Sequence, residues 1–138
     1  MNDFELDERL RNDTVAVTSL ALCDVRLMND SRYRWLLLIP RRAGVSEWHE
    51  LSAEDAAVLT REIHSASAVL KKCAGADKIN VAAIGNMVRQ MHVHVVARHE
   101  GDETWPGTVW NIGQAVPYDD ETVTHFCKAL SRELAPGS

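Results

Sequence analysis

Two histidines separated by one residue are the part of the sequence best suited to chemistry. His92 and His94 lie in a run in which polar and apolar residues alternate. This alternation predicts a strand over residues 90–97, whose side chains point to alternate faces of a sheet. Gln90, His92 and His94 would then share one face, with neighbours about 7 Å apart. We interpret residues 90–97 as an active-site strand.

Imidazole side chains in this pattern allow more than one chemistry. A neutral imidazole is a competent nucleophile near pH 7, because its reference pKa is about 6.5. One ring nitrogen must then be free to attack, while the other donates its proton to an acceptor such as a backbone carbonyl. A His-x-His pair on a strand is also a common half-site for zinc or iron. His99 or Glu100 would have to supply the third ligand, and no metal-site spacing supports this. A polar strand face that merely carries two imidazoles is the remaining alternative.

The composition indicates a soluble globular protein with neither nucleic acid nor membrane as a partner. The chain has 138 residues, of which 46% are hydrophobic and 25% charged, and a net charge of −5. This length allows one domain with a real core, and the negative charge offers no attraction to nucleic acid or an anionic membrane. Three widely spaced cysteines indicate neither disulfides nor a zinc knuckle. With no apparent signal peptide or membrane-spanning run, we expect a reducing, cytoplasmic setting.

The elements that must position the histidines follow an α+β order. A short helix capped by Asp3 precedes strands over residues 14–27 and 33–39, and a long helix runs from its cap Ser52 to Gly75. A strand over residues 79–84, the histidine strand and a last helix from Asp119 to Pro136 complete the chain. We expect a single domain over residues 1–138. It would be a mainly antiparallel sheet of about five strands, with the long helix packed on it and short terminal helices.

The motif and its surroundings resemble the histidine triad (HIT) family. The run Gln-Met-His-Val-His-Val-Val from Gln90 is similar to the family signature His-φ-His-φ-His-φ-φ, in which φ is apolar, with Gln90 in place of the first histidine. The strand pair before Pro40, the long helix and the Gly85-Asn86 break come in the family's order. The segment from Trp105 to Trp110 resembles the tail that follows the motif in a bacterial branch of the family. The resemblance covers residues 15–110 and implies a HIT-like fold.

The resemblance also implies an activity. HIT proteins are nucleotide hydrolases and transferases that act on the α-phosphate of nucleoside polyphosphates, dinucleoside polyphosphates or nucleoside phosphoramidates, and none of this implies a cofactor or a metal. The central histidine forms a covalent nucleotidyl-histidine that water hydrolyses, so His92 would be the nucleophile. His94, if protonated, could stabilise charge on the phosphate oxygens, to which Gln90 could donate a hydrogen bond. Because an amide is not a general acid, we expect slow turnover or leaving groups that need no proton.

Three further polar residues are candidates for substrate binding. Asn86 lies where the family commonly has a polar phosphate contact, and Asn29 where it has an asparagine that binds ribose hydroxyls. A plain turn residue is the alternative for Asn29. Arg98 could approach the phosphate or be a solvated strand end. We expect Trp35 in the core, although it could stack on a base.

The family implies a purine nucleotide and a second copy of the chain as partners. Its usual assembly is a homodimer in which the sheets of two subunits join. Trp105 and Trp110 lie in an expected loop and need burial on the partner, over the nucleotide pocket or on their own subunit. A nucleotide sensor with little catalysis is the main functional alternative, ahead of the metal site.

Overall fold

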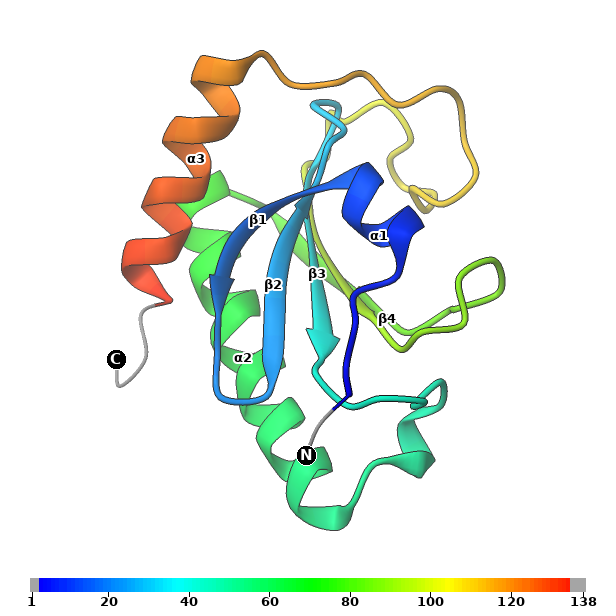
Figure 1. Cartoon of the computed structure of the whole chain (residues 1–138). Helices are drawn as coiled ribbons and strands as arrows, with labels where there is room; N and C mark the ends of the chain where they lie inside the picture. The colour runs from blue at the N-terminus through cyan, green and yellow to red at the C-terminus, as the bar shows by residue number, and fades with distance from the viewer. Residues whose placement is uncertain (1–2, 135–138) are drawn as a thin grey trace.

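A five-stranded antiparallel sheet forms the centre of the molecule (Figure 1). The computed structural model describes residues 3–134. Its strands are β1 (Thr14–Ser19), β2 (Cys23–Met28), β3 (Arg34–Pro40), β4 (Lys78–Ala82) and β5 (Val93–Arg98), in the spatial order β1-β2-β3-β5-β4. Each neighbouring pair is antiparallel. The predicted α+β fold and the predicted number of strands are therefore confirmed.

Helices lie on both faces of this sheet. They are α1 (Glu8–Asp13), the 3-10 helix η1 (Trp48–Glu50), α2 (Ala53–Ala74) and α3 (Asp120–Glu133). Figure 1 shows α2 behind the sheet, with α3 along one side, and α1 in front of it. No helix within residues 3–134 combines the length and the apolarity needed to cross a membrane.

The central strand β3 has a buried core on each of its faces, as its nearly continuous apolar sequence predicts. Leu36 and Leu38 pack in the larger core, which also contains buried residues of α2 and α3. Trp35 and Leu37 point to the opposite face and share a smaller core with Leu10 of α1. The histidine strand β5 pairs with β3, so its side chains also alternate between these two cores.

The caps of the long helix α2 are those expected from the sequence. The Ser52 hydroxyl accepts a hydrogen bond from the Asp55 amide at the N-terminus, and Gly75 ends the helix at φ 61°. This left-handed conformation suits glycine. The last helix likewise begins after the cap Asp119. Its predicted end at Pro136 lies outside the described residues.

Two predictions near the N-terminus are wrong. Asp7, and not Asp3, caps α1, because the Asp7 carboxylate accepts hydrogen bonds from the amides of Arg9 and Leu10. The run over residues 14–27 is a hairpin of β1 and β2 and not one strand. Its turn lacks glycine and proline, and the buried Glu62 carboxylate of α2 stabilises it by accepting hydrogen bonds from two turn amides. A partner 40 residues away gives no local signal in the sequence.

The histidine strand is shorter than predicted. β5 begins at Val93, so Gln90 and His92 precede it. The Met91 amide donates to the carbonyl of Val45, which lies in a loop and not in a strand. The motif therefore enters the sheet only at its second half.

Arg98 ends β5 inside the protein and joins it to the segment that follows. Its side chain is 1% exposed, and its guanidinium donates to both carboxylate oxygens of Asp102 at 2.8 and 2.9 Å and to the Asn80 side chain at 3.0 Å. The rings of Tyr33 and Trp105 lie 5.8 and 5.6 Å from the guanidinium carbon. The hydrogen bonds from Arg98 are the main reason that the pKa of Asp102 is lowered to about 2.

Replacing Asp102 should therefore destabilise the fold. Asp102→Asn keeps the shape but leaves the Arg98 guanidinium buried without a counter-charge, which typically costs about 3–5 kcal/mol. Urea unfolding at pH 7 measures this loss. The exposed Asp120→Asn on α3 is the control and should change stability by less than about 1 kcal/mol. Equal losses in the two variants would contradict the assigned role of Asp102.

Candidate active site

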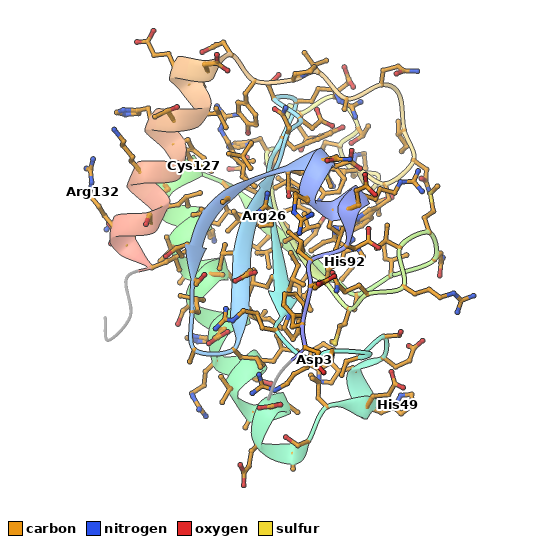
Figure 2. All side chains as sticks on the ribbon, viewed as in Figure 1. Asp3, Arg26, His49, His92, Cys127 and Arg132 are labelled. Carbon is orange, nitrogen blue, oxygen red and sulfur yellow. The ribbon has the colours of Figure 1, made fainter. Side chains whose placement is uncertain are left out.

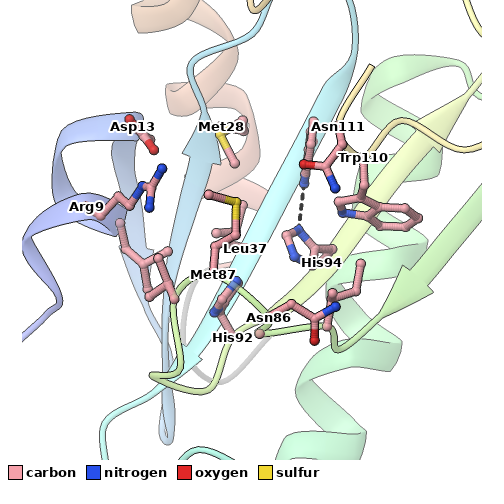
Figure 3. A pocket seen from close by; sticks show the side chains of 15 residues that line it. Arg9, Asp13, Met28, Leu37, Asn86, Met87, His92, His94, Trp110 and Asn111 are labelled. Atoms are coloured by element: carbon pink, nitrogen blue, oxygen red, sulfur yellow. Dashed lines mark hydrogen bonds between the residues drawn. The ribbon is translucent and has the colours of Figure 1, made fainter. Parts of the chain in front are cut away.

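A cavity of about 310 Å³ lies on the sheet face that carries Trp35 and Leu37 (Figure 3). Its walls are α1, the loop that follows β4 and the segment at Trp110, and both motif histidines line it. The lining residues used below are Arg9, Leu10, Asp13, Met28, Trp35, Leu37, Asn86, His92, His94 and Trp110. This volume suits a small-molecule site.

The backbone of the motif itself orients His92. The His92 Nδ1 atom lies 2.7 Å from the carbonyl oxygen of Gln90. A carbonyl only accepts hydrogen bonds, so Nδ1 carries the proton and Nε2 keeps its lone pair. The His92 side chain is buried but lines the cavity. This is the arrangement that the sequence analysis requires of a nucleophilic imidazole.

His94 has the opposite tautomer, which Trp35 imposes. The indole N–H of Trp35 donates to Nδ1 of His94 at 3.0 Å, so the proton of a neutral His94 ring is on Nε2. Burial, and to a smaller extent the nearby His92, lowers the pKa of His94 to about 3. The expectation of a protonated His94 is therefore corrected. Near neutral pH His94 offers an uncharged hydrogen-bond donor.

Aromatic rings surround the histidine pair. The rings of His92 and His94 lie 4.9 Å apart, and Trp110 contacts His94 at 5.4 Å and Trp35 at 6.3 Å between ring centroids. Trp110 therefore covers the pocket of its own subunit, one of the three positions expected for it. Within residues 3–134, the buried indole N–H of Trp110 has no hydrogen-bond partner.

Asn86 is the substrate-binding candidate that the structure brings to the cavity. It follows Gly85, which has φ 66° and so takes a conformation that favours glycine. Figure 3 shows Asn86 beside His92 at one end of the cavity. A phosphate contact from Asn86 stays a prediction.

The structure gives the other three candidates different contacts. Gln90 does not line the cavity, because its amide bonds the backbone of residues 5 and 7. The Asn29 side-chain oxygen accepts from the Tyr118 amide at 2.9 Å and so holds the segment before α3. Arg98 is buried in the ion pair with Asp102. We therefore retain none of the three as a direct contact to substrate.

The sequence analysis missed three groups of the site. It assigned Trp35 to the core or to a base, whereas the indole also fixes His94. A tryptophan in an apolar run gives no local signal of this role. Arg9 and Asp13 lie one turn apart on α1 and line the cavity, and only their four-residue spacing could have suggested a shared face.

The described residues give little support to a metal centre. Within residues 3–134, no group of three histidine, cysteine or acidic side chains is arranged to hold a metal ion. Figure 2 shows His49 at the edge of the molecule, well apart from His92. The histidine pair therefore lacks a third protein ligand in this part of the chain.

The low pKa of His94 predicts a dependence of stability on pH. Below pH 6.5 the unfolded chain takes up a proton at His94 that the folded protein excludes until about pH 3. The free energy of unfolding should therefore fall with decreasing pH in this window, by about 1.4 kcal/mol per unit. Urea unfolding at pH 7.5 and pH 5 measures the difference. His94→Gln should reduce it, whereas His125→Gln, at an exposed position on α3, should not. An unchanged difference in His94→Gln would contradict a neutral, buried His94.

The chain is similar to known proteins of one family. The model of the HIT domain matches residues 9–101. No curated protein matches the chain. Among solved structures, a histidine triad protein from Sinorhizobium meliloti 1021 is 49% identical, with a TM-score of 0.94, and the match covers 96% of this chain and 98% of that one.

Two further structures are similar over nearly their whole length. A histidine triad protein from Bradyrhizobium japonicum is 40% identical with a TM-score of 0.93, and the match covers 95% of this chain and 98% of that one. A histidine triad protein from Marinobacter aquaeolei VT8 is 42% identical with a TM-score of 0.92, and the match covers 95% of this chain and 96% of that one. With a family model over more than half of its length and relatives at this identity, the chain belongs to the histidine triad (HIT) family.

Proposed function

We propose that this protein is a nucleotide hydrolase or transferase that cleaves purine nucleoside conjugates at the α-phosphate through a nucleotidyl-His92 intermediate. The conjugates are nucleoside polyphosphates, dinucleoside polyphosphates or nucleoside phosphoramidates. Membership of the HIT family supports a nucleotide-binding or hydrolase-type role. The observation that carries the proposal is the hydrogen bond from His92 Nδ1 to the Gln90 carbonyl, because it leaves Nε2 free at the cavity.

In the first step, the Nε2 lone pair of His92 attacks the α-phosphorus. A phosphorus–nitrogen bond forms, and the bond from phosphorus to the leaving group breaks with its electron pair on the leaving group. The imidazole then carries a positive charge, which the Gln90 carbonyl stabilises through the Nδ1 proton. In the second step, water attacks phosphorus and releases a proton to solvent. The phosphorus–nitrogen bond breaks, and its electron pair returns to Nε2.

Neutral hydrogen-bond donors would stabilise the phosphoryl oxygens during both steps. His94 offers Nε2–H, and its orientation is set in advance by Trp35. Trp110 has a buried indole N–H without a partner in residues 3–134, and a ligand oxygen would satisfy it. Asn86 adds a side-chain amide at the rim. Donors fixed before the substrate binds need no reorganisation in the transition state.

The leaving group follows from the glutamine in the motif. An amide does not titrate, and the Gln90 amide is bonded to the backbone of residues 5 and 7. Position 90 therefore supplies no proton to the departing group. A phosphate that leaves as an anion needs none, so we place nucleoside and dinucleoside polyphosphates ahead of phosphoramidates.

We also propose a homodimer. Among the described residues 3–134, strand β4 has a partner strand on one side only, and Val81 of this strand is 46% exposed. An unpaired edge with an exposed apolar residue is suited to association with a second sheet.

A nucleotide sensor remains the second candidate function, because the same pocket would bind a nucleotide without turnover.

Replacing the nucleophile tests the reaction. His92→Gly should lower turnover of diadenosine and diguanosine polyphosphates by at least about a thousandfold, because no other group forms the covalent intermediate. The phosphorus–nitrogen bond of the adduct is labile in acid and stable at alkaline pH, so the wild-type reaction is quenched with denaturant at alkaline pH. Mass spectrometry should then find one nucleotidyl group on the peptide that contains His92.

His125→Gly, at the exposed position on α3, is the control and should keep full activity. Turnover that survives in His92→Gly would refute the proposed nucleophile. Nucleotide binding by the wild type without any adduct or turnover would favour the sensor. Activity that is lost on chelation and restored by zinc would favour a metal site.

Removing the Trp35 indole N–H should slow the chemical step. Trp35→Phe keeps an aromatic ring but frees Nδ1 of His94, so the Nε2–H tautomer is no longer fixed. We expect kcat to fall by about three- to tenfold with little change in KM. Steady-state kinetics measure both. Tyr33→Phe is the control, because Tyr33 directly precedes β3 and the change removes only a hydroxyl that is bonded to Thr104. A rise in KM at constant kcat would show that Trp35 acts on substrate binding instead.

A further inference from the structure

The two ends of the cavity differ in chemistry. His92 and Asn86 lie at one end, whereas Met28 and Asp13 lie at the other (Figure 3). Apolar side chains of Leu10, Met28 and Leu37 line the cavity, and Met28 lies at the second end, here called the apolar end. This inference rests on the proposed function: a nucleotide with its phosphorus at His92 extends its base toward the apolar end, where the flat ring is buried.

Two charged side chains of α1 stand at this apolar end. Arg9 and Asp13 are four residues apart, so they share one face of the helix, and both line the cavity. Within residues 3–134, neither side chain has an ion pair or a side-chain hydrogen bond in the structure, and both are exposed. Arg9 and Asp13 therefore offer a free guanidinium and a free carboxylate to a ligand at the apolar end of the cavity.

This pair complements one purine better than the other. The Watson–Crick edge of guanine has two neighbouring donors, N1–H and the N2 amino group, which a carboxylate accepts together. Its O6 and N7 acceptors match a guanidinium. Adenine offers a carboxylate one donor, its N6 amino group, and places the lone pair of N1 against the second oxygen. The carboxylate therefore discriminates against adenine.

A pair of hydrogen bonds made by Gln90 holds these groups in place. The Gln90 Oε1 atom accepts from the Asp7 amide at 2.8 Å, and Nε2 donates to the Glu5 carbonyl at 2.8 Å. Residues 5–13, here called the base wall, are thus fixed to the motif from more than 80 positions away. Gln90 is therefore a positioning residue for the base wall.

From this arrangement we infer that the base wall selects guanine, with Asp13 and Arg9 as the recognising side chains and Gln90 as their positioning residue. The substrates are accordingly guanosine conjugates.

Matched guanosine and adenosine ligands test the inference. Calorimetry measures the Kd of GMP and AMP, and steady-state kinetics measure kcat/KM for diguanosine and diadenosine tetraphosphate. The wild type should prefer guanine by about ten- to a hundredfold in both measurements. Asp13→Asn should lose this preference or reverse it, since an amide pairs well with adenine. Arg9→Ala should weaken GMP binding more than AMP binding.

Two neighbouring positions supply the controls. Glu8→Gln makes the same chemical change on α1 outside the cavity and should leave the guanine preference unchanged. Gln90→Met removes both hydrogen bonds but keeps the side-chain length, and should raise KM while kcat stays constant. Arg89→Met, at an exposed adjacent position, should change neither. Circular dichroism confirms that each variant is folded.

The outcomes separate this inference from the proposed function. Equal affinity for GMP and AMP, or the same preference in Asp13→Asn and Glu8→Gln, overturns the guanine assignment even if the His92 adduct forms. A guanine preference without any adduct supports guanine recognition by the base wall and overturns the proposed reaction at His92. A fall in kcat at constant KM in Gln90→Met places Gln90 in the chemical step and overturns its positioning role.

Discussion

The hydrogen bond between His92 and the carbonyl of Gln90 determines what the rest of the pocket can do. It fixes the proton on Nδ1, turns Nε2 toward the cavity and gives a charged imidazole an acceptor. Because the carbonyl belongs to the motif, two residues before the ring, the orientation does not depend on a distant side chain. The segment that supplies it is not yet a strand, so its carbonyl is not used in the sheet. The geometry of His92 therefore depends on β5 beginning only at Val93.

His94 obtains the complementary state from the sheet. It lies opposite Leu37 in the register of β3 and β5, and Trp35 lies two residues away on the same face of β3. Burial removes the charge from His94, and the indole N–H selects its tautomer. The neighbouring imidazoles of His92 and His94 therefore carry their protons on different ring nitrogens, Nδ1 in His92 and Nε2 in His94. One is an acceptor in the cavity and the other a donor, which suits an attack on phosphorus with stabilised oxygens.

The sequence predicted well what local patterns encode. The antiparallel α+β fold, the caps of α2 at Ser52 and Gly75, and the two-sided burial of β3 all follow from spacing and side-chain type. The failures at the β1–β2 turn and at Gln90 share a cause, because each depends on a partner far away in the chain. Glu62 stabilises a turn that carries no turn residues, and the amide of Gln90 bonds backbone near the start of the chain.

The candidate site was predicted only in part. His92 and Asn86 were found because the motif and the glycine beside it are local. In the sequence, Arg98 reads as a solvated cation at the end of a strand. Only the fold shows that it is buried in an ion pair with Asp102. Arg9 and Asp13 were missed because a six-residue helix carries too little periodicity to show which face it buries.

The shortness of α1 has a thermodynamic consequence. A helix of six residues is not stable by itself in water, so α1 keeps its position through the burial of Leu10 and its attachment to Gln90. The free energy that orders this segment is therefore part of the affinity for any molecule that touches it. By linkage, an occupied pocket protects the segment from local opening, and a loosened segment weakens occupancy by the same factor.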